Sequence, residues 1–147
     1  MAIRPLTATD RIAIDDLLRS YPYCNDTHDV EGMVALFTKD AVLEQASTGA
    51  RHEGKDGIRK WMNAHGSQPG RVGRQHRVQQ AQIKRTATGC KVRSYWMVIQ
   101  SVVATDSKVI RQMGYYDDEL VKIRGKWLIK SKYIGVWNDE MPALPKL

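Results

Sequence analysis

The sequence predicts an α+β fold in which helices pack on one face of a curved, mostly antiparallel sheet. Helical spacing of apolar residues is confined to about the first 65 positions, and β-type stretches fill most of the remaining positions. Short turn sequences join these stretches, which favours helices first and a meander of strands afterwards. The length of 147 residues, with 42% hydrophobic and 27% charged residues, fits one domain over residues 1–147.

The first predicted helix covers about residues 8–21. Segment 7–10 offers N-cap candidates, and the apolar residues that come after it fall near helical spacing: Ile12, Ile14, Leu17, Leu18 and Tyr21. Pro22 is expected to end or kink this helix, because proline lacks the backbone N–H that the helix needs. The polar residues 25–28 are expected to form a break after it.

A short second helix comes next, and its predicted buried face consists of Val30, Met33, Val34, Leu36 and Phe37. Lys39 and Asp40 are expected to close it. The sequence then predicts, in order, a strand at 41–46, a turn at 47–49, a loop at 53–57, a third helix over about 58–65 and a flexible connection at 66–73.

Four long β-type stretches make up most of the remaining sequence: 72–85, 90–104, 109–123 and 127–137. The connections between them, at 87–89, 105–107 and 124–126, have the composition of tight turns. Successive strands joined in this way form an antiparallel meander.

The formal net charge of +7 comes from one part of the chain. Residues 57–105 contain no Asp or Glu, but they contain nine basic residues: Arg59, Lys60, Arg71, Arg74, Arg77, Lys84, Arg85, Lys91 and Arg93. Because basic and apolar residues alternate as they do in strands, one charged face of the sheet is the favoured interpretation. Contact with an acidic substrate or partner is the alternative. Nucleic acid is not expected as a partner, since no recognition element accompanies the charge.

Several classes of function are not supported by the sequence. It contains no metal-ligand spacing, no phosphate-binding glycine loop, no dinucleotide fingerprint and no Gly-x-Ser-x-Gly motif. No apolar run is long enough for a membrane span, and residues 1–5 do not resemble a signal peptide. The lack of such a run predicts no membrane partner, and Cys24 and Cys90 fit no disulfide framework, which favours a cytoplasmic location.

Two ionisable residues, Asp26 and His76, are candidate functional residues. Taken alone, Asp26 is most simply a turn or N-cap residue for the second helix. Taken alone, His76 is most simply a hydrogen-bonded structural residue of the first long strand. Arg74 shares the strand face of His76 and is a candidate for holding an anionic group.

Short motifs spread over nearly the whole chain resemble the SnoaL-like family of the nuclear-transport-factor-2-like superfamily. They are Ile14-x-x-Leu17-Leu18-x-x-Tyr21, Asp26-x-x-Asp29, Leu36-Phe37-Thr38-x-Asp40-Ala41-Val42, Gly57-Ile58-x-x-Trp61, Gln75-His76-x-Val78 and Gly114-x-Tyr116-x-Asp118-x-Leu120-x-x-x-x-Gly125-x-Trp127. The resemblance implies a cone-shaped fold, with three N-terminal helices on the concave side of a highly curved sheet.

The resemblance also implies site residues. In dehydratase and dehydrochlorinase members, an Asp at the end of the first helical segment orients a strand His that removes a proton from carbon, and Asp26 and His76 match these positions. Tyr21, Tyr116 and Lys132 match substrate-binding positions. Core packing is the alternative for Tyr21, and a solvated face is the alternative for Lys132.

The function implied is a lyase that needs no cofactor and no metal. It would act on a small apolar, aromatic or alicyclic substrate by dehydration, dehydrohalogenation or retro-aldol cleavage. Two alternatives are an isomerase or polyketide-type cyclase that uses the same base, and a non-catalytic binding or assembly subunit related to dioxygenase β subunits. The assembly subunit predicts a cone filled by side chains, with no cavity beside His76. A homodimer or homotrimer is expected, because a large open sheet usually buries a face or edge against another copy.

Overall fold

A computed structural model of the chain describes residues 3–66, 71, 73–137, 144 and 146–147. Within these residues the elements, in chain order, are α1 (Ala8–Thr27), α2 (Val30–Ala35), β1 (Phe37–Gln45), β2 (Ala50–Glu53), α3 (Gly54–Gly66), β3 (Arg74–Arg85), β4 (Gly89–Val102), a 3-10 turn at Val103–Thr105, β5 (Ser107–Ile123) and β6 (Lys126–Val136). The predicted connection at 66–73 lies largely outside the described residues.

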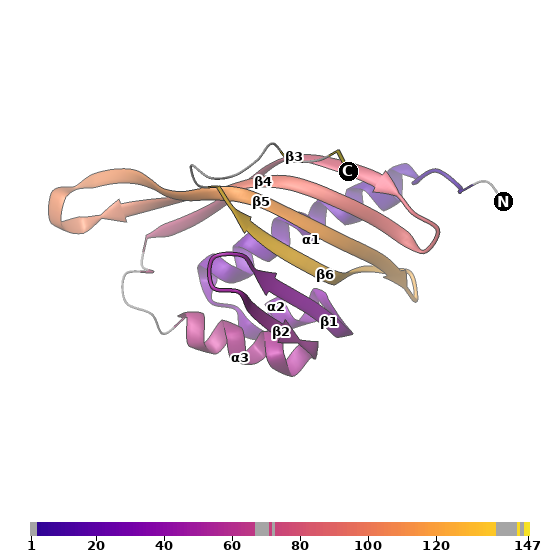
Figure 1. Ribbon diagram of the computed structural model, residues 1–147, viewed down its shortest axis with the longest axis horizontal. Coiled ribbons are helices and arrows are strands. Elements are labelled where there is room, and N and C mark those ends of the chain that lie inside the picture. The colour runs from indigo at the N-terminus through magenta and orange to yellow at the C-terminus, as the bar shows by residue number, and fades with distance from the viewer. Residues whose placement is uncertain (1–2, 67–70, 72, 138–143, 145) are drawn as a thin grey trace.

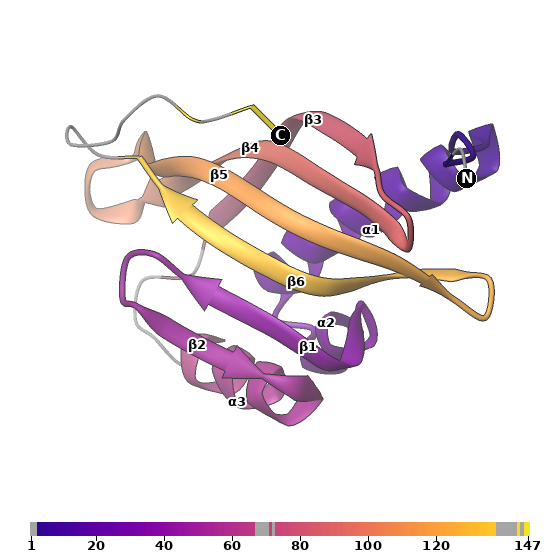
Figure 2. The same ribbon diagram turned by 45° about the vertical axis from the view of Figure 1, so that its right-hand side comes forward.

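The strands form one mixed sheet in the order β2-β1-β6-β5-β4-β3. Neighbouring strands are antiparallel except β1 and β6, which are parallel. The three helices gather on one side of this sheet (Figure 1), and Figure 2 shows β1 and β2 continuing it beyond β6. Since β2 and β3 remain as its edges, the sheet does not close into a barrel. The predicted α+β class is confirmed.

Helix α1 is longer than the sequence predicted. It continues through Pro22 to Thr27, and the left-handed His28, with φ 54°, caps its end. The turns beyond Pro22 bury Cys24 and Asn25 on the face that already buries Tyr21. This burial offsets the backbone hydrogen bond that proline cannot make. The predicted break at 25–28 is therefore wrong, and Asp26 lies in the last turn of a helix.

The predicted boundaries around α2 also need correction. The helix ends at Ala35, and β1 begins at Phe37, whose predicted place was in the helix. Parallel pairing with β6 takes over here, because the backbone N–H of Ile129 donates to the carbonyl of Leu36 at 2.9 Å. The turn at 47–49 leads into β2, a strand that the sequence prediction missed, and α3 begins at Gly54.

One side chain fixes the start of α1 against the far end of the sheet. Asp10 forms a capping box with Thr7 and accepts hydrogen bonds from Lys122 Nζ at 2.7 Å and Trp127 Nε1 at 2.9 Å. These bonds hold the pKa of Asp10 well below its ordinary value. Because this end of α1 is anchored to β5 and β6, the opposite end is carried across the sheet to β3.

Two bulges change which residues face the helices. In β3 the pairing with β4 shifts between Gln79 and Gln82, and Gln80 adopts a left-handed φ of 55°. In β6 the pairing with β5 shifts at Glu119 and Leu120, where Ser131 and Ile129 are the respective partners. A bulge adds one residue to one strand, so the inward-facing parity reverses after it.

Candidate functional site

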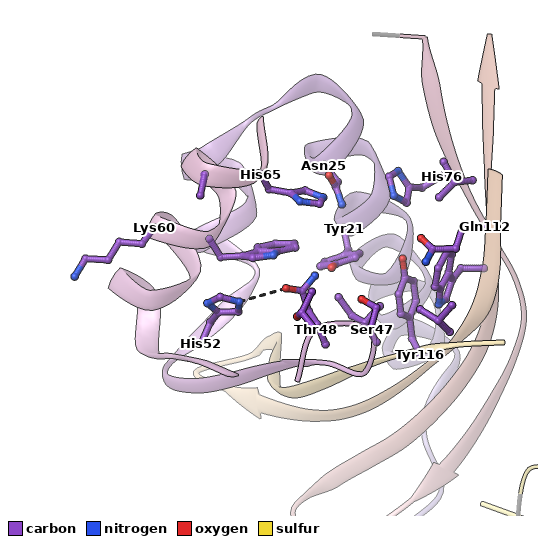
Figure 3. Close-up of a pocket in the computed structure, with 17 residues that line it drawn as sticks. Tyr21, Asn25, Ser47, Thr48, His52, Lys60, His65, His76, Gln112 and Tyr116 are labelled. Carbon is purple, nitrogen blue, oxygen red and sulfur yellow. Dashed lines mark hydrogen bonds between the residues drawn. The ribbon is translucent and has the colours of Figure 1, made fainter. Parts of the chain in front are cut away.

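A cavity of about 500 Å³ lies between the helices and the sheet, and residues from both layers line it (Figure 3). Aromatic side chains form much of its wall, and polar groups converge on it from α1, α3 and β5. The lining residues are Tyr21, Asn25, Gln45, Ser47, Thr48, His52, Lys60, Trp61, Ala64, His65, His76, Trp96, Val98, Gln112, Tyr116, Ile134 and Val136. The cavity thus combines aromatic and apolar walls with many polar side chains, and convergent polar groups in a cavity are typical of a small-molecule site.

The structure brings Asp26 and His76 together at one end of the cavity. Asp26 Oδ1 lies 2.5 Å from His76 Nδ1, and Asp26 Oδ2 accepts the backbone N–H of His76 at 2.8 Å. The side chains are 21% and 10% exposed, respectively. Because one carboxylate holds both the ring and the main chain of His76, the imidazole has one fixed orientation.

This contact also determines the tautomer of His76. An ionised carboxylate can only accept hydrogen bonds, so Nδ1 carries a proton, and in the neutral imidazole the lone pair is then on Nε2. His76 lines the cavity as well as contacting Asp26. The arrangement places a proton acceptor beside the space where a ligand would lie.

The simpler interpretation of Asp26 as the N-cap of α2 is wrong. Asp29 has that role, since its Oδ1 accepts the backbone N–H of Gly32 at 2.8 Å. Arg74 does share the inward side of β3 with His76, where its Nε donates to Gln100 Oε1 at 2.9 Å.

Tyr21 and Tyr116 both line the cavity and are almost fully buried. Their rings meet edge to face, with centroids 5.5 Å apart, and Tyr116 also stacks on Trp96 at 5.7 Å. Burial raises the pKa of each phenol well above its ordinary value, so both hydroxyl groups stay protonated and can donate. Among the described residues, Tyr21 Oη has no hydrogen-bond partner.

Lys132 lies beneath the cavity and does not line it. Its Nζ donates to the two carboxylate oxygens of Asp118 at 2.8 and 2.9 Å, and both side chains are buried. Lys132 was predicted to contact a substrate directly, but in this structure its ammonium group binds Asp118 and is not among the groups that line the cavity. The alternative of a solvated face is wrong, because only 2% of Lys132 is exposed.

The sequence prediction missed His65 as a cavity residue, because a histidine at the end of a helix is readily accounted for by the helix dipole alone. Its ring stacks on Trp61, with centroids 5.2 Å apart and an interplanar angle of 20°. Burial and the nearby Arg71 cation lower the pKa of His65 to about 4. The i, i+4 spacing of Trp61 and His65, which places both on one helix face, was the available signal.

This burial predicts a specific dependence of stability on pH. The ordinary pKa of His65 is 6.5 and its folded-state pKa is about 4, so between these values the unfolded chain binds more protons. The folded protein therefore loses stability as pH falls through this range. We expect His65→Gln to make the free energy of unfolding less steep between pH 6.5 and 4, as measured by urea denaturation. An equally steep dependence in the variant would contradict the assignment.

Metal sites and membrane spans are both missing from the part of the chain that the structure describes. The described residues contain no group of three or more His, Cys, Asp and Glu side chains that could hold a metal ion. None of the helices in these residues is long and apolar enough to cross a membrane.

Known proteins share both the sequence pattern and the fold. Residues 6–133 match the SnoaL-like domain, whereas no curated protein matches the chain. A protein of unknown function with a cystatin-like fold from Nostoc punctiforme is 25% identical, over 96% of this chain and 100% of that one, with a TM-score of 0.80. A candidate scytalone dehydratase from Novosphingobium aromaticivorans is 24% identical over 88% and 85%, with a TM-score of 0.75.

Streptomyces coelicolor ActVI-ORFA is 16% identical, over 89% of this chain and 98% of that one, with a TM-score of 0.76. At this identity the likeness shows a shared fold. Together, the family match over most of the sequence and the helices on a six-stranded open sheet show that this chain belongs to the SnoaL-like family of the nuclear-transport-factor-2-like superfamily.

Proposed function

We propose that this protein is a cofactor-independent lyase that removes a proton from carbon in a small cyclic substrate. The observation that carries the proposal is the Asp26–His76 contact at the cavity, which leaves the Nε2 lone pair of His76 as the proton acceptor. The family includes dehydratases, cyclases and isomerases, a range of reactions consistent with such a base.

The proposed reaction begins with transfer of a proton from a carbon next to a carbonyl group to His76 Nε2. The electron pair of the C–H bond moves toward the carbonyl oxygen, to which Tyr21 or Tyr116 would donate a hydrogen bond. In a dehydration, this electron pair then forms the C=C bond as the β-hydroxyl leaves. The proton on His76 passes to that oxygen, so water is released and the base is regenerated.

Asp26 supports this step through charge as well as geometry. Proton transfer converts His76 to imidazolium, and the adjacent carboxylate stabilises that cation. Because both side chains are mostly shielded from water, their attraction is stronger than it would be at the surface.

The cavity walls indicate the class of substrate. Aromatic rings of Trp61, Trp96 and Tyr116 border the space, which suits a flat aromatic or alicyclic compound. The cavity itself argues against the assembly subunit, which predicted a cone filled by side chains.

A proton-exchange assay tests the proposal before the natural substrate is identified. The native protein would be incubated in deuterium oxide with a panel of cyclic β-hydroxy ketones, and the products analysed by mass spectrometry. We expect deuterium incorporation next to the carbonyl, followed by loss of water. His76→Ala should reduce the exchange rate by about 10²- to 10⁴-fold, the usual contribution of a positioned general base.

Arg77→Ala is the matched control, because Arg77 is exposed on the outward side of the same strand. Its exchange rate should equal that of the native protein. Exchange without loss of water, with rearrangement at constant mass, would favour the isomerase or cyclase. No acceleration of exchange by the native protein on any ketone, or full activity of His76→Ala, would contradict the proposal.

A further inference from the structure

A buried ion pair lies directly beneath the two cavity tyrosines. Lys132 on β6 and Asp118 on β5 are cross-strand partners, and their side chains are 1% and 0% exposed. Lys132 Nζ lies 3.8 Å from the ring centroid of Tyr116 and 4.2 Å from that of Tyr21. The positive end of the pair therefore contacts the faces of both rings.

All the hydrogen-bonding capacity of this ammonium group can be accounted for. Two of its three N–H directions serve the carboxylate oxygens of Asp118. The group also lies well within the 6 Å or so over which a cation is attracted to an aromatic face. The rings thus take the place that water or a second acceptor would occupy.

Stability alone does not explain a pair in this position. Removing two charges from water is costly, and apolar side chains of similar volume often stabilise a core equally well or better. The charges act on the cavity through its wall, because the two tyrosines whose rings they contact both line it (Figure 3).

The hydroxyl group of Tyr21 indicates which chemical group a ligand would supply to this site. Tyr21 Oη is buried, and no described residue accepts a hydrogen bond from it. Buried polar groups nearly always have a partner, so a ligand oxygen in the cavity is the expected acceptor. A hydrogen bond to that oxygen is stronger when the oxygen carries negative charge.

We infer that Lys132 is a positioning residue, held by Asp118, that acts through Tyr21 and Tyr116 to favour an anionic enolate or phenolate oxygen in the cavity. Besides burial, the Asp118 carboxylate raises the pKa of both phenols and so weakens their O–H donors. The ammonium, which lies on the ring faces between them and that carboxylate, draws electron density from the phenols and opposes this effect. The ligand class is a small cyclic compound that carries such an oxygen. The inference rests on the proposed function for the place of the ligand, but its test needs no turnover.

The test compares two probes of nearly the same shape. Pentafluorophenol is ionised at neutral pH, whereas pentafluorotoluene has a methyl group in place of the oxygen. Isothermal titration calorimetry of the native protein should show at least about tenfold tighter binding of the phenolate, the size expected of a desolvated cation–π and hydrogen-bond contribution. Lys132→Met/Asp118→Leu should reduce this preference several-fold without changing the affinity for pentafluorotoluene, because both tyrosines remain but lose the cation on their ring faces.

Glu119→Gln/Lys130→Met is the matched control. It removes an ion pair between the same two strands whose side chains are 33% and 48% exposed, and the preference for phenolate should persist. If the apolar double variant does not fold, Lys132→Gln/Asp118→Asn removes both charges but keeps groups that can hydrogen-bond across the strands. The same reduction of the preference is expected.

A folded charge-free variant that retains the full preference would show that the pair only packs, which overturns the inference. Equal binding of both probes to the native protein would also overturn it. The result is separable from that of the exchange assay. A protein without exchange activity that prefers phenolate refutes the lyase alone, and an active protein without the preference refutes the role of Lys132 alone.

Discussion

Replacing Asp26 with asparagine is expected to slow proton abstraction by His76 about a hundredfold or more. The variant side chain is almost the same size and can still accept a hydrogen bond from the main-chain N–H of His76, so β3 should keep its place. It loses the negative charge that stabilises imidazolium, and its amide can also donate to Nδ1 and favour the wrong tautomer.

The measurement is the rate of deuterium exchange into a ketone that the native protein processes. Asp29→Asn is the appropriate control, since Asp29 is exposed and caps the neighbouring helix. An exchange rate for Asp26→Asn within a few-fold of the native rate would show that His76 works without its carboxylate partner. The proposed pair would then be only structural.

Replacing Lys132 with methionine is expected to have the largest effect on stability. The substitution leaves the carboxylate of Asp118 buried without its cation, and breaking a buried pair in this way costs about 3–5 kcal/mol. Urea denaturation of the native and variant proteins measures this loss. Adding Asp118→Leu should restore most of it, because the core then contains no unpaired charge.

The loss should also depend on pH. Burial raises the pKa of Asp118 and Lys132 opposes that rise, so in Lys132→Met the pKa of the folded state is raised further. A carboxyl group with a raised folded-state pKa adds stability below its unfolded pKa, near 3.9, and this stability is lost as pH rises through the folded value. The variant should therefore be closest to native stability in acid. A deficit that does not change with pH would contradict this origin.

The pairing of Asp26 with His76 could be predicted from sequence, but only through the family resemblance. Residue patterns alone predicted a helix that ended at residue 21 and a polar break at 25–28. The burial of Cys24 and Asn25 carries the helix past Pro22, and no local signal in the sequence reveals that burial. The family motif predicted the contact between Asp26 and His76 correctly, although the predicted break at 25–28 was wrong.

The position of Lys132 shows a different limit of sequence patterns. Trp127 and Ile129 are buried, so strict alternation would place Lys132 on the outward face of β6. The bulge at Lys130 reverses that parity and turns Lys132 toward the core. A bulge depends on pairing with the neighbouring strand, which explains why the strand's own sequence did not reveal it.

The bulge in β3 divides that strand into two segments, and different contacts fix the position of each segment. Up to Gln79, the pairing of β3 with β4 determines where His76 lies. This segment is also held by the hydrogen bond from the main-chain N–H of His76 to Asp26. Beyond Gln82, the strand faces the helices with the opposite parity. Loss of one residue at Gln80 or Ala81 would restore regular pairing and leave His76 in place, whereas loss of one residue between His76 and Gln79, with the pairing beyond it kept, would turn the imidazole outward. Deletions in descendants of this sequence should therefore be tolerated at 80–81 and absent from 77–79.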